Sequence, residues 1–156
     1  MFATDLAMEV LPNIHLVGML TVLFTALFRT RALIPIYIYV ILTGLFYGFA
    51  IWWLAYLYIW LPLWGLAMLV PMRAPAWLCC AVYPLITCLH GLFFGVLYAP
   101  AQALFFGLNF EQTLAWISAG LVFDVIHAVS NLALGMLVYP LKGVLVRLLK
   151  RVGYDR

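Results

Sequence analysis

The sequence predicts an all-α integral membrane helical bundle, and two observations lead to this fold class. Of its 156 residues, 69% are apolar and 8% are charged, whereas soluble domains are about half apolar and about a quarter charged. The apolar residues also form continuous runs of roughly 20, the length of a helix that crosses a bilayer. Continuous rather than alternating runs favour helices over barrel strands. We therefore predict one membrane domain over residues 1–156.

Five membrane spans are predicted, each bounded by basic residues, glycine or proline. Arg29 and Arg31 follow the first run, and Pro71 and Pro75 enclose Arg73 after the third. Proline interrupts the hydrogen bonds of a helix, so it marks the end of that run. The predicted spans lie at residues 11–28, 32–48, 50–70, 77–98 and within 118–139.

Basic residues set the predicted orientation, because Lys and Arg in short loops favour the cytoplasmic side. Their positions are Arg29, Arg31, Arg73, Lys142, Arg147, Lys150, Arg151 and Arg156. With five spans all of these residues face the cytoplasm, and residues 140–156 form a basic cytoplasmic tail. The net charge of +3 therefore indicates orientation and not affinity for nucleic acid.

Residues 100–116 are apolar enough to suggest a sixth span, but we predict an external cap instead. A span here would move the basic tail to the outside, against the charge distribution. Polar side chains would also be expensive in lipid: Gln102, Asn109, Glu111 and Gln112. Five spans place the N-terminus outside, so we expect residues 1–10 to be the remnant of a truncated first span.

Asp124, His127 and Asn131 form the strongest chemical cluster in the sequence. Offsets of three, four and seven residues place them on one helix face. Ionisable groups at membrane depth usually face a cavity or partners, so this face is predicted to bind a ligand. The alternative is a hydrogen-bond cluster that joins helices, in which Asp124 accepts from His127.

Histidine and tryptophan residues supply further candidates. His90 precedes Gly91, which with Gly95 forms a GxxxG motif that permits close helix packing. Aromatic residues of the third run recur on one helix face, which suits either a flat or cationic ligand or an interfacial belt. We favour the belt, except for Trp53 and Trp116, which lie near the polar groups of the outer end.

The sequence contains no catalytic motif, metal-ligand spacing or phosphate-binding loop, so we expect no enzymatic activity, metal or cofactor. Two other functions remain open. The first is an intramembrane enzyme that uses Asp124 and His127 for acid–base chemistry. The second is a structural membrane subunit in which the polar cluster holds helices together.

Three motifs resemble the substrate-binding S components of energy-coupling factor (ECF) transporters, from Met1 to about Leu141. They are Leu11-Pro-Asn-Ile-His15, the run from His90 to Pro100, and Phe123-Asp-Val-Ile-His-Ala-Val-Ser-Asn131. The resemblance implies a six-helix bacterial membrane protein that binds a vitamin or related micronutrient beneath an external cap. It also implies docking on a transmembrane coupling protein with two ATPase subunits.

Within that resemblance, His90 and Asp124 match ligand-contact positions of the thiamine-binding branch. The departure is at the N-terminus, where the first family helix is largely missing. The predicted protein is thus a multi-pass transport subunit of the bacterial cytoplasmic membrane, with a cytoplasmic C-terminus and an unidentified substrate. The predicted substrate-binding residues are Trp53, His90, Trp116, Asp124, His127 and Asn131, with Asn109 and Glu111 in the cap.

Overall fold

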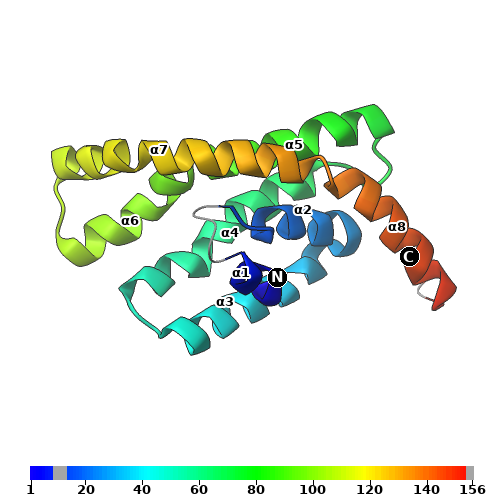
Figure 1. Cartoon of the computed structure of the whole chain (residues 1–156), viewed down its shortest axis with the longest axis horizontal. Coiled ribbons are helices and arrows are strands. Elements are labelled where there is room, and N and C mark those ends of the chain that lie inside the picture. Colours follow the sequence, from blue (N-terminus) through cyan, green and yellow to red (C-terminus); the bar gives the residue numbers. More distant parts are fainter. Residues whose placement is uncertain (9–13, 154–156) are drawn as a thin grey trace.

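The computed structural model describes residues 1–8 and 14–153, and every regular element in these ranges is a helix (Figure 1). Glu9 and Arg156, which belong to the predicted N-terminal remnant and basic tail, lie outside the described residues. The elements are α1 (Phe2–Ala7), α2 (Val17–Phe28), η1 (Arg29–Ala32), α3 (Leu33–Tyr47), α4 (Ile51–Leu69), α5 (Ala76–Leu92), α6 (Phe94–Phe106), α7 (Phe110–Gly135) and α8 (Val138–Arg151).

Four helical stretches of the described chain are long and apolar enough to cross a membrane: Val17–Tyr47, Ile51–Leu69, Ala76–Phe106 and Phe110–Gly135. A helical membrane bundle is therefore supported, but the count differs from the five predicted spans. The stretch Val17–Tyr47 covers most of the described parts of two predicted spans, 11–28 and 32–48, and contains α2, η1 and α3. Separately, α2 has 12 residues and α3 has 15, fewer than the roughly 20 that a straight crossing needs.

The chain changes direction where the sequence predicted a break. Arg29 adopts a φ of 55°, which lies outside the helical region and stops α2. Its guanidinium group donates hydrogen bonds to the carbonyl oxygens of Met68 and Val70 at the end of α4. One residue therefore ends α2 and pairs with carbonyl groups at the C-terminal end of α4, where such groups have no partner within the helix.

Basic residues gather at one end of the molecule, which we call the basic end. The turn between α4 and α5 lies beside α8 at this end, while the α3–α4 and α6–α7 turns lie at the opposite end (Figure 1). The described basic residues near the first of these turns, in η1 and on α8 are Arg29, Arg31, Arg73, Lys142, Arg147, Lys150 and Arg151. The basic residues that are spread over separate loops in the sequence therefore lie at one end of the folded molecule.

Two clusters of buried side chains hold the bundle together. The aliphatic cluster joins α2, α4, α5 and α8 and includes Leu23, Leu27, Leu63, Ile86 and Val138. The aromatic cluster joins α2, α3, α4 and α6. It is built around Tyr39, Ile59 and Trp60, with Trp53, Tyr56, Trp64, Phe94 and Tyr98 packed against it.

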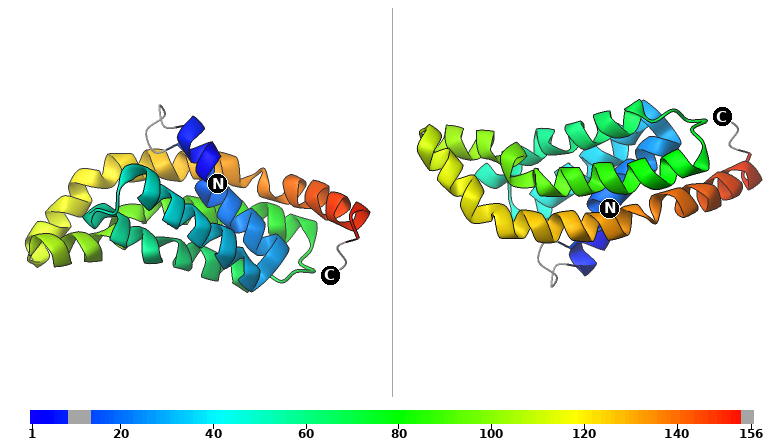
Figure 2. Two further views of the ribbon diagram at one scale, coloured as in Figure 1. Left: turned by 90° about the horizontal axis from the view of Figure 1, so that it is seen from below. Right: turned by 90° about the horizontal axis from the view of Figure 1, so that it is seen from above.

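Glycine allows α5 and α6 to pack closely on α7, which lies beside α5 in Figures 1 and 2. A Cβ atom at Gly91 would lie 2.8 Å from the backbone carbonyl of His127, and one at Gly95 would lie 2.6 Å from an Asp124 carboxylate oxygen. Such distances leave no room for a side chain. The close approach predicted from the GxxxG motif is confirmed.

The predicted cap segment 100–116 forms a helical hairpin rather than a separate element. Helix α6 continues to Phe106, Gly107 adopts a left-handed conformation with φ of 63°, and α7 begins at Phe110.

The predicted tail begins as α8, in which Pro140 occupies the first turn, where proline is tolerated. Leu141 and Leu145 pack on the aliphatic cluster, while Lys150 and Arg151 are exposed.

Candidate functional site

The three histidines of the sequence lie around one tryptophan inside the bundle. The ring of His90 stacks on Trp60 with centroids 5.5 Å apart and an interplanar angle of 29°. His15 meets Trp60 edge-on at 6.2 Å and His127 at 4.8 Å. Four parts of the chain, the residues before α2 and helices α4, α5 and α7, therefore contribute to one group of polar rings.

Polar side-chain atoms without hydrogen-bond partners concentrate in this region. Among the residues that the structure describes, seven buried nitrogen or oxygen atoms have no partner, whereas nearly all buried polar groups in proteins are paired. The residues that carry them are called the polar core. They are His15 (Nδ1), Thr21 (Oγ1), Trp60 (Nε1), His90 (Nδ1), His127 (Nε2) and Asn131 (Nδ2 and Oδ1).

Hydrogen bonds fix the chemical character of several of these atoms. The Nε2 atom of His90 lies 2.9 Å from the carbonyl oxygen of Ile59 and must donate to it. In the neutral ring, Nδ1 is then an acceptor, while the indole nitrogen of Trp60 can only donate. Asn131 offers both a donor and an acceptor. The polar core can therefore pair with a molecule that carries donors and acceptors.

Asn131 and Thr21 extend the polar core from the histidines toward α2. Asn131 lies four residues after His127, one turn further along α7, and is fully buried. A Cβ atom at Gly18 would lie 3.3 Å from both amide atoms of Asn131, so α2 approaches this side chain through a glycine. Thr21 follows one turn later on α2 and is also fully buried.

Asp124 has a structural partner. Its two carboxylate oxygens lie 3.1 and 3.2 Å from the backbone nitrogen of Gly95 and accept its N–H. Gly95 is in the first turn of α6, where N–H groups have no partner within the helix. Asp124 therefore caps α6 from α7, in a position that also suits the helix dipole. The sequence left open a hydrogen bond from His127 to Asp124. In the structure the Asp124 carboxylate accepts from the Gly95 backbone instead.

Trp53 and Trp116 lie outside the polar core. The indole nitrogen of Trp53 donates to the carbonyl oxygen of Val40 over 2.7 Å. Trp116 stacks on Tyr98 with centroids 5.9 Å apart. In the described part of the chain, no ring contact joins either tryptophan to a histidine. The structure thus brings together His90, His127 and Asn131, with Asp124 beside them.

Asn109 and Glu111 lie at the exposed turn between α6 and α7. Asn109 accepts a hydrogen bond from the Gln112 backbone nitrogen, and its own backbone nitrogen donates to the Gln112 side chain, both over 2.9 Å. This reciprocal arrangement is a capping box. Glu111 is in the first turn of α7, where negative charge is favourable. Both residues therefore help to start α7.

The sequence interpretation gave too little weight to His15 and Trp60. Trp60 belongs to the aromatic stripe of the third apolar run, which was assigned mainly to an interfacial belt. His15 is a single histidine near the start of the first run and precedes α2. The spacing of residues within one helix could not reveal them, because their neighbours come from other helices.

A metal centre is not formed by these side chains, since no group of three His, Cys, Asp or Glu in the described ranges is arranged to hold an ion. No protein-family model matches the chain, and neither a similar curated protein nor a similar solved structure was found. The site is therefore characterised by its own residues: a histidine- and tryptophan-lined polar core between helices long enough to span a membrane.

Proposed function

We propose that the protein captures a small micronutrient within the membrane, as the substrate-binding subunit of an ECF-type importer. One observation carries the proposal, the seven unpartnered polar atoms of the polar core. A buried donor or acceptor without a partner costs about 1–3 kcal/mol. A bound molecule that supplies those partners would recover this cost, so the interior is suited to ligand binding.

The rings of the polar core also limit the kind of molecule that fits. Trp60 and His90 stack on each other, and Phe94 lies 4.9 Å from the ring of His127. Apolar and aromatic walls with a few placed polar groups are typical of small-molecule sites. The substrate that suits them is a planar ring with hydrogen-bond donors and acceptors on its edge. Vitamins with heterocyclic rings belong to this class.

The assignment to the ECF class is based on the three sequence motifs that resemble S components. In this assignment the protein does not hydrolyse ATP, and transport requires a transmembrane coupling protein and two ATPase subunits. The basic end faces the cytoplasm according to the positive-inside rule, and the α6–α7 turn faces outside. A C-terminal fusion to a protein that fluoresces only in the cytoplasm should therefore be bright.

Mass spectrometry of small molecules released from gently purified protein tests ligand capture. Wild-type protein should retain one compound at close to one molecule per chain. His127→Phe keeps a ring of similar size but removes the unpartnered nitrogen, and should reduce retention at least tenfold. Val129→Ala is the matched control on α7, because Val129 is 63% exposed, and should retain the compound normally.

Absence of any retained compound in the wild type, or equal retention by His127→Phe, would contradict ligand capture. Conversion of the released compound by the purified protein would instead support the intramembrane enzyme. ATP-dependent uptake is tested separately in liposomes that contain the coupling protein and both ATPases. Binding without such uptake would retain the capture role and reject the ECF assignment.

A further inference from the structure

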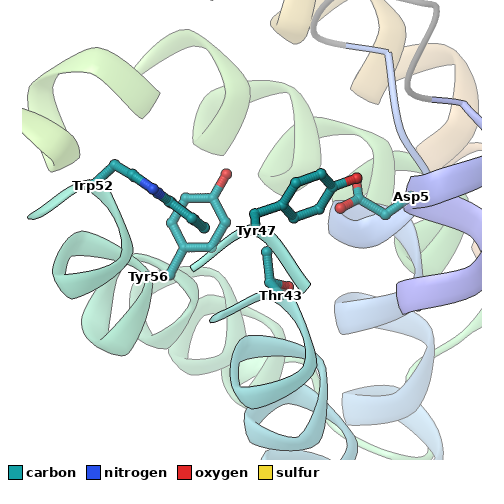
Figure 3. A pocket seen from close by; sticks show the side chains of 5 residues that line it. All are labelled: Asp5, Thr43, Tyr47, Trp52 and Tyr56. Atoms are coloured by element: carbon teal, nitrogen blue, oxygen red, sulfur yellow. The ribbon is translucent and has the colours of Figure 1, made fainter. Parts of the chain in front are cut away.

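A hollow lies between α1 and the α3–α4 hairpin, away from the basic end. Its volume is about 390 Å³, and its lining residues are Asp5, Thr43, Tyr47, Trp52 and Tyr56 (Figure 3). We call it the aromatic pocket. This volume is within the range of roughly 300–1,000 Å³ that is usual for small-molecule sites. None of its lining residues belongs to the polar core.

Three aromatic rings form the walls of the aromatic pocket, and neighbouring contacts hold them in place. Trp52 and Tyr56 meet edge-on with centroids 5.5 Å apart. Tyr56 packs in turn on Trp60 at 5.9 Å, and Phe46 packs on Tyr47 at 4.9 Å. Because these rings are already supported by other side chains, they need little rearrangement to bind a ligand.

The single acidic side chain of the aromatic pocket is Asp5. One of its carboxylate oxygens accepts a hydrogen bond of 3.0 Å from the Tyr39 hydroxyl, and Tyr47 points toward the carboxylate in Figure 3. The described Lys and Arg side chains lie at the basic end. The described groups that act electrostatically on Asp5 and can carry positive charge are the Met1 amino group and His15.

A carboxylate beside aromatic faces is a favourable environment for an organic cation. The negative face of Trp or Tyr attracts ammonium groups within about 6 Å, and this attraction grows when the cation is removed from water. We propose that the aromatic pocket binds a small primary or quaternary ammonium compound. Asp5 neutralises the charge, while Tyr47, Trp52 and Tyr56 contact its alkyl groups. This site is independent of capture by the polar core.

Calorimetric titration of the full chain in a maltoside detergent tests this proposal. The probes are choline, tetramethylammonium and ethanolamine, and the neutral control is 3,3-dimethyl-1-butanol, which has the shape of choline without its charge. At least one cation should bind ten times or more tightly than the neutral compound. Choline-based detergents and lipids are excluded because they would compete.

Substitutions locate the binding to the aromatic pocket. Asp5→Asn keeps the shape of the side chain and should weaken cation binding at least tenfold. Glu111→Gln removes an exposed acid at the same end of the molecule, and should leave the affinity within twofold. Trp52→Leu should weaken binding about fivefold, whereas Trp52→Phe should preserve most of it, which separates the aromatic requirement from a general loss of folding.

Four outcomes would overturn the proposal. The first is absence of binding by all three cations, and the second is equal binding of choline and its neutral analogue. The third is unchanged affinity in Asp5→Asn together with unchanged affinity in Trp52→Leu. The fourth is equal weakening by Trp52→Leu and Trp52→Phe. Cation binding would then depend on the shape of the tryptophan side chain and not on an aromatic face.

Discussion

The aliphatic and aromatic clusters are both buried, but the polar side chains near them differ in their hydrogen bonding. In the aliphatic region, Thr25 donates to the carbonyl oxygen of Thr21 over 2.7 Å, and Lys142 lies 3.4 Å from the Tyr83 hydroxyl as a donor. In the polar core beside the aromatic cluster, Trp60 and Asn131 have side-chain atoms without partners. Among the described residues, the buried side-chain atoms without partners belong to the polar core, which includes the Thr21 hydroxyl, and not to Thr25 or Tyr83.

This difference indicates a division between stability and function. Completed hydrogen bonds and close aliphatic packing stabilise a helix bundle, in which van der Waals contacts are the main source of helix association. Unpaired buried groups destabilise it, so their retention in one place suggests a use for them. Substitutions in the aliphatic region should therefore change stability, and those in the polar core should change ligand retention.

The largest effect is expected from Leu27→Ala in the aliphatic cluster. Leu27 is 2% exposed, and the cavity left by its truncation should lower the free energy of unfolding by about 2–5 kcal/mol. Unfolding can be followed by circular dichroism in detergent, with retained compound measured on the folded fraction. Leu85→Ala is the control, since Leu85 is 52% exposed. Loss of compound without loss of stability would break the proposed division.

A smaller loss is expected from Gly91→Ala at the crossing of α5 and α7. The added methyl group would meet the backbone of His127 at 2.8 Å, so the helices must separate, at a cost of about 1–3 kcal/mol. Gly120→Ala on α7 is the matched control because a Cβ there meets nothing within 4 Å. Equal stability of the two variants would show that the close crossing is unimportant.

Asp124→Ala tests a residue that stabilises the fold by capping α6 and is also predicted to bind substrate. Loss of the carboxylate leaves the Gly95 N–H without its partner, which should cost about 1–2 kcal/mol, as for other helix caps. Asp124→Asn keeps an acceptor and should recover most of that stability. If Asp124 also contacts substrate, both variants will weaken binding about tenfold, or 1.4 kcal/mol. Normal binding by Asp124→Asn would restrict the residue to capping.

The smallest change in stability is expected from Asn131→Leu, and it has the opposite sign. Leucine is similar in size and removes two unpaired amide atoms, so stability should stay the same or rise by about 1 kcal/mol. Retention of the small molecule should nevertheless fall. Higher stability with full retention would identify Asn131 as an unused polar group and would weaken the case for the polar core.

Much of the fold could be predicted because it depends on local sequence. Long apolar runs predict membrane helices, Arg29 and Pro71 lie at observed helix boundaries, and Gly91 occupies a close crossing. The five-span count differs from the four long apolar stretches because α2 and α3, joined through η1, are each shorter than a straight crossing needs. Similarly, segment 100–116 could be recognised as unusual from its polar interruptions, but its helical hairpin form could not be inferred from them.

The sequence by itself determined the all-helical membrane class, the concentration of basic residues in alternate loops and the shared face of Asp124, His127 and Asn131. Only the tertiary structure decided that Asp124 caps α6 and that His15 and Trp60 join His90 and His127. It also brought Asp5 to the aromatic side chains of α3 and α4. The physical reason is that periodicity gives the direction of a side chain from its own helix, whereas its partners depend on how separate helices pack.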